Sequence, residues 1–594
     1  MSAAGAVQNG AIQLRAPRQR WVIAESHPQQ AEALANAARI PLVLAELLIA
    51  RGINTAAEAF AFLNPVTSHL HDPLLMLGMA AAVERVEGAV ARKEPILLYG
   101  DYDVDGTTAV VLLKTAIEML GGVVRFHVPH RLREGYGLQS AVLEAAYADG
   151  VRLVITVDTG MRAFAEAETA RRLGLDLIIT DHHLARLDDT LPDALAILNP
   201  NQHDCSYPEK SLCGAAIALK LAQALLERHD AERMRLKLLP SFLKMTAIAT
   251  IADAVPLRGE NRVIAALGLR ELRRPAGAGL RALFAAAQLD PASRAITSFD
   301  VAFRLAPRIN AAGRMDVASD IIELFCTRDA GRATELAGKL ERLNRERRET
   351  EAVALAAIET RLATDPELSD ARLVVVDGDG WHRGVVGILA SRVVERTAKP
   401  ALVVSVEDGV AHGSGRSVDG FPLLSAIETC ADLFTRFGGH AFAVGFSLPA
   451  SSVPELKRRL AECAAERLAT REPERILKIH AEVPLHQITA LLAGWLRKLE
   501  PVGHGNPEPI FVARRALLLS APRIMKDRHL RLELAHEQGA KATRAVGWDL
   551  AELAAELELA QGSRIDIAYR IRENLHPDFG GLEVEIAGIR PVSD

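Results

Sequence analysis

Short apolar runs that end in acidic residues are the clearest pattern in the first half of the chain. Residues 96–99 (ILLY), 153–157 (LVITV) and 175–180 (LDLIIT) are such runs, and the Ala-, Glu- and Arg-rich stretch 161–172 separates the second from the third. Short, β-branched runs are typical of strands buried on both faces of a sheet. Strands that alternate with helices predict right-handed crossovers and a parallel sheet. The pattern therefore predicts an α/β domain.

Carboxylates and imidazoles stand where these three predicted strands end. Residues 101–106 (DYDVDG) follow the first strand, Asp158 follows the second, and residues 181–183 (DHH) follow the third. Because ligands gather outside the carboxyl ends of parallel strands, we expect these side chains to converge at one edge. Clustered carboxylates repel one another and lose hydration unless cations neutralise them. A divalent metal site is therefore predicted; the alternative, solvated turns, would need three coincidences.

A further carboxylate, Asp253, lies in the apolar segment 246–257 (TAIATIADAVPL). Buried Asp is rare unless it is paired or bound to a ligand, so Asp253 is another candidate for the site. A helix cap or a salt-bridged core residue is the alternative. Oxygen-rich ligands with one imidazole suit Mg²⁺ or Mn²⁺, and the histidine favours Mn²⁺.

The rest of the chain predicts a helical start, a long helix and two further domains. Residues 329–363 are continuous helix former, long enough to bridge domains. A second α/β pattern ends near residue 468, and short alternating strands with one helix at 550–559 then predict an OB-type barrel. We expect the first 20 residues, small and polar, to be disordered. The predicted parts are a helical segment at 1–75, an α/β domain at 76–328, a connecting helix at 329–366, a smaller α/β domain at 367–468 and the barrel at 469–594.

Composition narrows the class of protein. The net charge is only −5 over 594 residues, so any surface for nucleic acid must be local. The five cysteines are scattered, which indicates neither a disulfide scaffold nor a zinc site. No stretch is long and apolar enough to span a bilayer, and the N-terminus lacks a signal-peptide pattern. We expect a cytoplasmic protein that does not enter a membrane.

Nine motifs carry a resemblance to a known family. They are DYDVDG at 101–106, REGYGL at 133–138, ITVDTG at 155–160, DHH at 181–183, TIADAVPL at 250–257, LAPRINAAGRM at 305–315, HGSGRS at 412–417, FGGHAFAVGF at 437–446 and PVGHGNPEPIF at 501–511. In this order and spacing, the chain from about residue 75 onward resembles the DHH phosphoesterases and, among them, the RecJ family of single-strand-specific DNA exonucleases. The resemblance implies a parallel-sheet DHH domain, a connecting helix, a DHHA1-like α/β domain and an OB barrel.

The resemblance also implies a metal pair. Two Mn²⁺ or Mg²⁺ ions would be bound by Asp103, Asp105, Asp158, His182 and Asp253. Asp101 and Asp181 would lie close by, either in contact with the ions or behind their ligands. His183 is the candidate for contacting the phosphate or assisting the leaving oxygen, and a structural role is its alternative. Such a pair stabilises the attacking and leaving oxygens of a phosphoryl displacement.

Substrate contacts are expected outside the metal site. Around Gly313 the candidates are Arg308, Asn310 and Arg314. At the second-domain motifs, where the resemblance implies nucleotide contacts, they are His382, Ser414, Arg416, Gly438, Gly439 and His440. Arginine is a natural partner for phosphate oxygens, although a structural salt bridge is the alternative for each arginine near Gly313. We expect the glycine-flanked segments at 412–417 and 437–440 to be loops that expose backbone amides to anions.

The implied activity is 5′-to-3′ hydrolysis of single-stranded DNA to 5′-mononucleotides in recombination and repair; the residue pattern alone indicates metal-dependent phosphoester hydrolysis. A phosphodiesterase of short oligonucleotides or cyclic dinucleotides is the alternative, but that class generally lacks the barrel. A non-catalytic scaffold is disfavoured because every ligand position is kept. Implied partners are single-stranded DNA, a single-stranded-DNA-binding protein and a helicase, with the chain a monomer. In the barrel, we expect Lys526, Arg528, His529 and Arg531 along a DNA backbone, and Trp548 in the core instead of stacked on a base.

Overall fold

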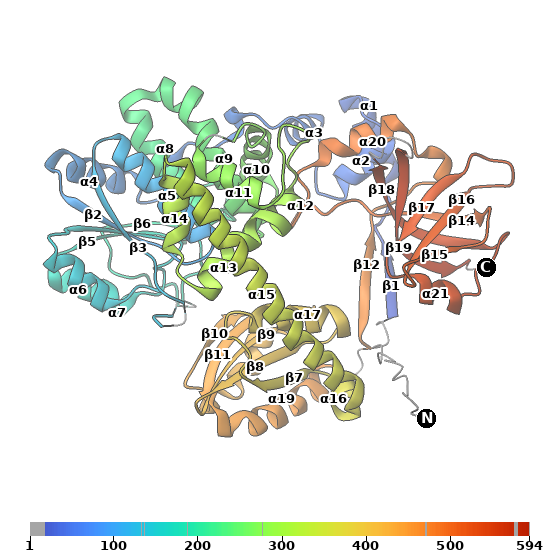
Figure 1. The fold of residues 1–594 in the computed structure, drawn as a ribbon. Coiled ribbons are helices and arrows are strands. Elements are labelled where there is room, and N and C mark those ends of the chain that lie inside the picture. The colour runs from blue at the N-terminus through green and yellow to red at the C-terminus, as the bar shows by residue number, and fades with distance from the viewer. Residues whose placement is uncertain are drawn as a thin grey trace. The chain divides into compact units, whose positions relative to one another are not determined.

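The computed structural model describes residues 18–592, except 132, 136, 187, 276, 470–471 and 575–579 (Figure 1). The chain divides into two compact units. The larger comprises 21–313, 317–341 and 478–594, and the smaller contains 314–316 and 342–477. The predicted fold class is confirmed: a parallel-sheet α/β domain, a second α/β domain and a C-terminal barrel. Of the first 20 residues, expected to be disordered, 1–17 lie outside the described residues. Residues 18–20 begin the strand β1 (Arg18–Ile23), so the expectation was wrong there.

Five parallel strands form the sheet of the first domain, in the order β3-β2-β4-β5-β6. Their bounds are β2 (Pro95–Tyr99), β3 (Val123–His127), β4 (Leu153–Val157), β5 (Asp176–Thr180) and β6 (Ala196–Leu198). The strand order reverses between β2 and β4, because β3 lies on the other side of β2. A reversal of this kind leaves a crevice outside the strand ends, where ligands bind in open α/β sheets.

Helices cover both faces of this sheet, which is why its strands are apolar throughout. On one face, α5 (Val104–Met119) is buried along most of its length and packs against α8 (Gly214–Arg233) and α9 (Leu239–Ala252). On the other face, α6 (Ser140–Ala148) and α7 (Phe164–Leu173) enclose an apolar cluster with the strands (Figure 1). None of the described helices is both long and apolar enough to cross a membrane.

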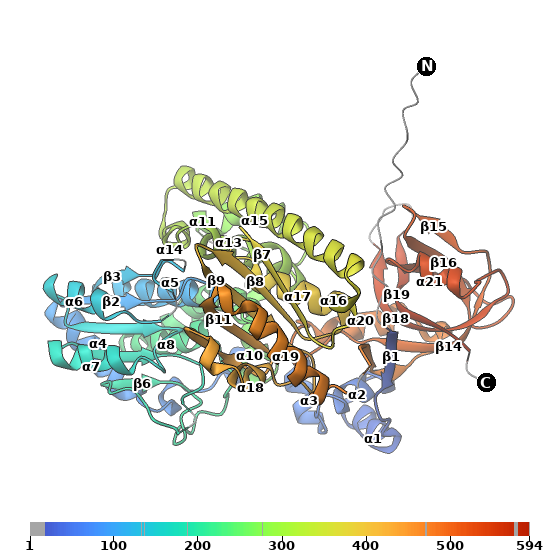
Figure 2. The ribbon, with the colours of Figure 1, turned by 90° about the horizontal axis from the view of Figure 1, so that it is seen from below.

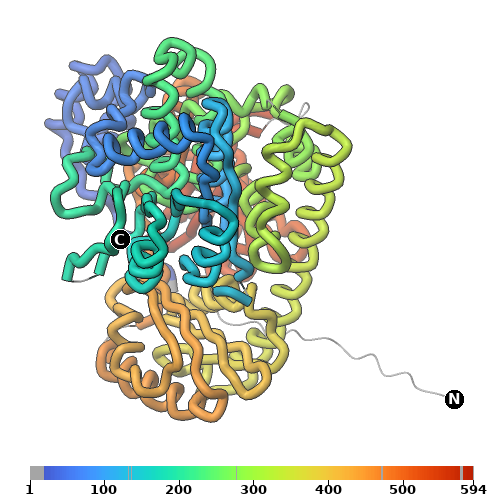
Figure 3. The backbone as a smooth tube through the Cα atoms, turned by 90° about the vertical axis from the view of Figure 1, so that its left-hand side faces the viewer, coloured from blue at the N-terminus to red at the C-terminus, as the bar shows by residue number. Residues whose placement is uncertain are grey.

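The smaller unit holds a sheet with the strand order β10-β11-β9-β8-β7 and forms one compact body, yellow to orange in Figure 3. Its strands are β7 (Val374–Asp379), β8 (Ala401–Glu407), β9 (Val410–Arg416), β10 (Arg436–His440) and β11 (Ala443–Pro449). Helix α17 (Val386–Thr397) packs against β8 and β9, and the apolar side chains of α19 (Val453–Arg467) share a core with the sheet.

Two predicted loops of this unit are strands. Residues 412–416 belong to β9 and residues 437–440 to β10, so the expectation of glycine-rich loops was wrong. The glycines serve packing between strands: a Cβ on Gly413 would come within 2.1 Å of the Phe446 ring on β11, and one on Gly439 within 2.1 Å of the Ala443 carbonyl oxygen. Glycine inside a strand often marks such a close approach.

A single helix of 35 residues, α15 (Ala330–Thr364), follows the first domain, as the continuous helix-forming sequence predicts. It can be traced without interruption in Figure 2. Five barrel strands come later in the chain: β14 (Phe511–Leu518), β16 (His529–Ala535), β17 (Thr543–Gly547), β18 (Arg564–Asn574) and β19 (Gly581–Pro591). Pairing of β14 with both β16 and β18 closes the barrel, and the predicted barrel helix is α21 (Ala551–Glu556).

The N-terminal helices and the barrel share one hydrophobic core, which the sequence pattern did not indicate. The helices are α1 (Pro28–Ala38), α2 (Leu42–Ile49) and α3 (Ala56–Leu63), and Figure 2 shows them beside the barrel. Their buried leucines, such as Leu44 and Leu48, join a cluster with barrel side chains including Phe511 and Leu534. The N-terminal segment and the barrel were predicted as separate parts, but helices α1, α2 and α3 have a common core with the barrel strands.

A buried arginine joins this assembly to the first domain. Arg262, on α10 (Gly259–Glu271), is 2% exposed, and its guanidinium donates to the carbonyl oxygen of Phe62 and to carbonyl oxygens in the segment 498–501. Burial lowers the pKa of Arg262 to about 9, with the charge of Arg51 adding to the effect. Backbone carbonyl oxygens accept from each of its buried N–H groups, so this contact stabilises the packing of α10 against the segments at Phe62 and 498–501.

Candidate metal centre

The loop after β2 places three carboxylates at the start of α5. Asp103 is the N-cap of this helix, and its Oδ1 accepts hydrogen bonds from the backbone N–H groups of Asp105 (2.8 Å) and Gly106 (3.0 Å). A carboxylate is favourable at a helix N-terminus, where backbone N–H groups lack partners within the helix. Asp101 is 6% exposed, and its Oδ1 is buried without a hydrogen-bond partner among the described residues.

The N-terminus of α8 holds the third carboxylate. Asp105 Oδ2 accepts from the Gly214 N–H (2.6 Å) and Oδ1 accepts from the Ala215 N–H (2.9 Å). A Cβ on Gly214 would lie 2.7 Å from Asp158 Cβ and 3.0 Å from Asp105 Oδ2, so only glycine fits here. Gly214 could not be predicted from the sequence, because a glycine at the start of a predicted helix has no distinctive local signature.

Asp158, after β4, adopts an unusual backbone conformation. Its φ is +61°, in the left-handed region, and the Gly160 that follows has φ +125°. A non-glycine residue there costs about 1–3 kcal/mol and persists only where its surroundings impose it, commonly at functional sites. The backbone N–H of Asp158 donates to the Thr180 carbonyl oxygen (2.9 Å), which fixes this turn against β5.

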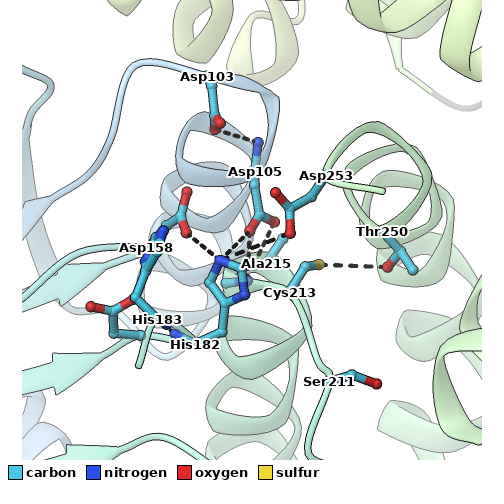
Figure 4. Close-up of polar contacts among 12 residues, drawn as sticks. Asp103, Asp105, Asp158, His182, His183, Ser211, Cys213, Ala215, Thr250 and Asp253 are labelled. Atoms are coloured by element: carbon cyan, nitrogen blue, oxygen red, sulfur yellow. Dashed lines mark hydrogen bonds and ion pairs between the residues drawn. The ribbon is translucent and has the colours of Figure 1, made fainter. Parts of the chain in front are cut away.

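The ring of His182 lies among carboxylates from three different elements (Figure 4). Its Nε2 is 3.2 Å from Asp158 Oδ1, 3.8 Å from Asp253 Oδ2 and 3.9 Å from Asp105 Oδ2. Asp253 is the residue at which α9 ends, so it approaches from the opposite side to the strand ends. Burial lowers the pKa of His182, which favours the neutral imidazole that a metal ion requires.

The five predicted ligands, together with Asp101 and His183, form three overlapping groups, and within each group the ligand atoms lie within 4.8 Å of one another. The groups are Asp101, Asp103 and Asp158; Asp105, His182 and Asp253; and Asp158, His182 and His183. Burial, followed by the charge of a neighbouring carboxylate, raises the pKa values of Asp101, Asp103, Asp158 and Asp253. Buried carboxylates with raised pKa values, one with an oxygen that lacks a donor, fit divalent cations.

Asp181 is not part of any of these groups among the described residues, and it orients the two histidines instead. Its Oδ1 accepts from the backbone N–H groups of His182 (2.8 Å) and His183 (3.1 Å) and contacts the His183 ring at Nδ1 (2.7 Å). Its Oδ2 accepts from the Met161 N–H (2.9 Å). Burial alone would lower the pKa of His183, but the hydrogen bond and charge of Asp181 outweigh it and raise that pKa to about 9.

Two asparagines that the sequence analysis missed hold the backbone of the DHH segment. The Asn199 side-chain N–H donates to the His183 carbonyl oxygen (2.9 Å), and the Asn201 side-chain N–H donates to the His182 carbonyl oxygen (3.0 Å). Both follow β6, the strand next to β5. Their sequence, Asn199-Pro200-Asn201, reads only as a turn, so no local signal links them to the site.

Helix α13 (Ala306–Met315) contacts the loop after β2, which carries three of the carboxylates. Asn310 Oδ1 accepts from the Val104 N–H (3.1 Å), and a Cβ on Gly313 would lie 2.2 Å from the Tyr102 carbonyl oxygen. Asn310, predicted to bind substrate, therefore contacts the loop that carries the ligands. Arg308 forms an ion pair with Glu341 (2.5 Å), the structural arrangement given above as its alternative.

Two of the predicted substrate residues of the smaller unit, Ser414 and Arg416, lie near the start of α17. Ser414 and Arg416 are two residues apart on β9, and Arg416 Nη1 donates to Ser414 Oγ (3.0 Å). A Cβ on Gly387 would lie 3.3 Å from both side chains. A guanidinium beside the N-terminus of a helix is a suitable place for a phosphate.

The other residues of the predicted set have separate places. His382 Nδ1 accepts from the Gly384 N–H (3.0 Å), and the Arg314 guanidinium donates to the Gly384 carbonyl oxygen (3.1 Å). Gly438, Gly439 and His440 lie on β10, the edge strand of the sheet.

Trp548 is at the barrel surface, which corrects its predicted place in the core. Its side chain is 54% exposed, and its ring meets the His529 ring edge-on at a centroid distance of 5.0 Å. It follows β17 at a turn, where Asp549 has φ +55°. A low aromatic content made burial the favoured prediction, but the position at a strand end leaves this ring open to solvent.

The gain in melting temperature on adding Mn²⁺ should increase with pH. Without metal, the raised folded-state pKa values of the four carboxyl groups stabilise the fold fully below about pH 3.9, and this contribution is lost as the pH rises through those values. Bound cations neutralise the carboxylates and so offset this loss of stability. The gain in melting temperature should therefore be larger at about pH 7.5 than at about pH 5.5. Thermal melts at both pH values check this, and equal gains would contradict the site.

The family comparisons agree with this architecture. A model of the N-terminal domain of the DHH family matches residues 95–250, one of the DHHA1 domain matches residues 370–466, and one of the RecJ OB domain matches residues 479–586. The first match spans the sheet and every residue of the carboxylate and histidine cluster except Asp253. Fold and site together therefore define a protein of the DHH class.

Relatives in that class cover nearly the whole chain. The single-stranded-DNA-specific exonuclease RecJ of Bacillus subtilis is 36% identical over 93% of this chain and 68% of its own length, and that of Dickeya dadantii is 35% identical over 92% of each. The crystal structure of RecJ in complex with Mn²⁺ from Thermus thermophilus is 29% identical, covers 97% of this chain and 80% of that chain, and has a TM-score of 0.82. The chain belongs to the RecJ family.

Proposed function

We propose that this protein is a single-strand-specific 5′-to-3′ exodeoxyribonuclease that releases 5′-mononucleotides and acts in recombination and repair. The observation that carries the proposal is the ligand cluster at the reversal point of the sheet, where His182 Nε2 lies 3.2–3.9 Å from three carboxylates. The named activity of the RecJ relatives supports DNA as the substrate and hydrolysis from an end.

The residues of the metal centre have different roles. Asp103, Asp105, Asp158, His182 and Asp253 would hold two Mn²⁺ or Mg²⁺ ions. Such ions supply a nucleophile at neutral pH and charge stabilisation for the displaced phosphate oxygen. Asp101, in one group with Asp103 and Asp158, would either contact an ion or support its ligands, and Asp181 holds both histidines in position through three hydrogen bonds.

His183 is suited to the phosphate itself. Its side chain is 47% exposed, and Asp181 raises its pKa to about 9, so the ring carries a proton at neutral pH. A charged imidazole attracts a phosphate oxygen and can donate a proton to the leaving oxygen. Ser414 and Arg416, with the backbone near Gly387, are proposed to bind a substrate phosphate.

The proposal extends to partners and location. Single-stranded DNA is the substrate, and a single-stranded-DNA-binding protein and a helicase are the proposed partners of a monomeric, cytoplasmic enzyme. The barrel surface around Trp548, with Lys526, Arg528 and Arg531, is the proposed site for the rest of the strand. His529, also predicted along the DNA backbone, is only 8% exposed and packs against the Trp548 ring instead. Exposed aromatic rings with neighbouring cations are typical of single-strand binding.

Hydrolysis should require a free, unpaired 5′ end. A linear single strand, the same strand with a blocked 5′ end, a circular single strand and a blunt duplex are incubated in parallel with Mn²⁺. We expect only the free linear strand to be degraded rapidly, because a paired end must first unstack. Comparable degradation of the circle would indicate an endonuclease, and comparable degradation of the duplex would remove the single-strand specificity.

A further inference from the structure

Two phenylalanine rings are exposed together in the first domain. Phe299, on α12 (Ser298–Asp300), is 63% exposed, and Phe303, in the π-helical turn η4 (Val301–Leu305), is 67% exposed. Their centroids are 4.6 Å apart, with 34° between the ring planes. Within the described stretch 288–316 they are the only large hydrophobic side chains exposed to this degree. Exposed apolar surface of this kind can mark a binding site.

The backbone that carries the rings is held firmly. Thr297 and Asp300 form a capping box at the start of α12, and the Asp300 carboxylate pairs with the guanidinium of Arg294 (2.6 Å). Arg304 donates to the Ala287 carbonyl oxygen (2.8 Å). The exposure of the two rings therefore belongs to a fixed structure, and π-helical turns such as η4 occur often at functional sites.

A continuous helical path leads from the ring pair to the loop that carries the metal ligands. The turn η4 leads into α13, whose Asn310 accepts from the Val104 N–H at the loop with the metal ligands. Phe303 lies seven positions before Asn310 in the sequence, a distance of about 10 Å along a helix. That distance equals about three stacked nucleotides. A strand with its scissile phosphate at the metals thus has bases within reach of the rings.

The composition of the surface favours nucleobases over a protein partner. A stable protein interface buries about 800 Å² on each side, much more than two rings offer. One or two bases match the area and the flat shape of the pair. The guanidiniums of Arg294 and Arg304, 41% and 33% exposed, share the single carboxylate of Asp300, so this group of three carries a net positive charge. Phosphates would be attracted there.

We propose that Phe299 and Phe303 form a stacking platform for a nucleobase of the single strand, a few nucleotides from the scissile phosphate. The inference rests on the proposed function, since it assumes a single-stranded substrate in the metal centre. The platform would contribute to binding and to holding the strand in register, and it would take no part in the bond cleavage itself.

Single-base substitution along the strand tests the platform. A series of 5′-phosphorylated oligonucleotides carries one abasic nucleotide at each successive position from the 5′ end. With wild type we expect KM to rise about tenfold for an abasic nucleotide at one internal position, because stacking on an aromatic ring contributes about 1–3 kcal/mol per base. In the F299A/F303A variant this position should lose its effect, while KM for the intact strand rises about tenfold and kcat changes less than twofold.

A second measurement avoids catalysis. Metal-free protein is titrated with strands that carry 2-aminopurine at the sensitive position, and stacking on the rings should quench its fluorescence. Phe303→Tyr should keep the quenching, whereas Phe303→Leu, apolar but not planar, should lose most of it. Leu491→Ala is the matched control, because Leu491 is 72% exposed in the same unit and lies on α20 (Ala490–Leu496).

The outcomes separate this inference from the proposed function. Wild type that fails to hydrolyse single strands would overturn the proposed function, whatever the variants do. Active wild type with an abasic profile that F299A/F303A leaves unchanged would overturn the platform alone. Equal quenching by the Tyr and Leu variants of Phe303 would also overturn it, since apolar contact without stacking would then be sufficient.

Discussion

Replacing Asp158 with asparagine should lower the rate of hydrolysis about a thousandfold without destabilising the metal-free protein. Asp158 lies 3.2 Å from the His182 ring and belongs to two of the three ligand groups, so its charge is needed to hold cations. Asparagine keeps the shape and tolerates the φ of +61° at this position. Rates at saturating Mn²⁺ and melts without metal check the two halves of this expectation.

The sign of the stability change makes this test specific. Burial and neighbouring charges raise the pKa of Asp158, so above the ordinary aspartate pKa of about 3.9 the buried charge opposes folding. Its removal should leave the metal-free melting temperature equal or higher at neutral pH. Asp189→Asn is the control, since Asp189 is exposed and has φ +54°. A variant at position 158 that retains more than about a tenth of the activity would show that this residue is not a ligand.

Gly214→Ala should weaken Mn²⁺ binding at least tenfold and reduce hydrolysis about a hundredfold. A methyl group here would lie 2.7 Å from Asp158 Cβ and 2.8 Å from its Oδ1, which forces either Asp158 or the start of α8 to move. Movement of α8 would break the two backbone hydrogen bonds to Asp105. Calorimetric titration with Mn²⁺ measures the affinity separately from the rate.

Gly494→Ala provides the matched control for this substitution. Gly494 is also helical, on α20, and the nearest atom to its added Cβ is an Arg497 guanidinium nitrogen at 3.7 Å. Alanine should be tolerated there or stabilise the helix slightly. Wild-type affinity for Mn²⁺ in Gly214→Ala would mean that the close approach of α8 does not position the ligands.

The convergence of the metal ligands was predictable from the sequence, because the carboxyl ends of neighbouring parallel strands lie at the same edge of a sheet. Carboxylates and histidines directly after β2, β4 and β5 must meet if these strands are parallel neighbours, and they do. The residues that position the ligands were not predictable from the sequence. Gly214 contacts Asp105 across 109 positions of sequence, and it donates through its backbone N–H, a group that every residue except proline possesses.

The same limit explains the other differences. Ser414 and Arg416 belong to a strand because Gly413 accommodates the Phe446 ring of the neighbouring strand, and glycine in sequence reads equally as a loop. The core shared by α2 and the barrel joins segments that lie more than 400 positions apart, and such contacts leave no periodic signal in either segment. Patterns indicate which face of an element is buried, but they do not indicate its partner.

The size of the first labelled product tests the proposed activity most directly. A long single strand with a labelled 5′ phosphate is digested with Mn²⁺, and products are separated at time points that begin before one tenth of the strand is consumed. We predict that the label is released as a 5′-mononucleotide from the first time point, because the 5′ terminus is the proposed point of attack. Label that persists in long fragments, or is released last, would contradict 5′-to-3′ hydrolysis.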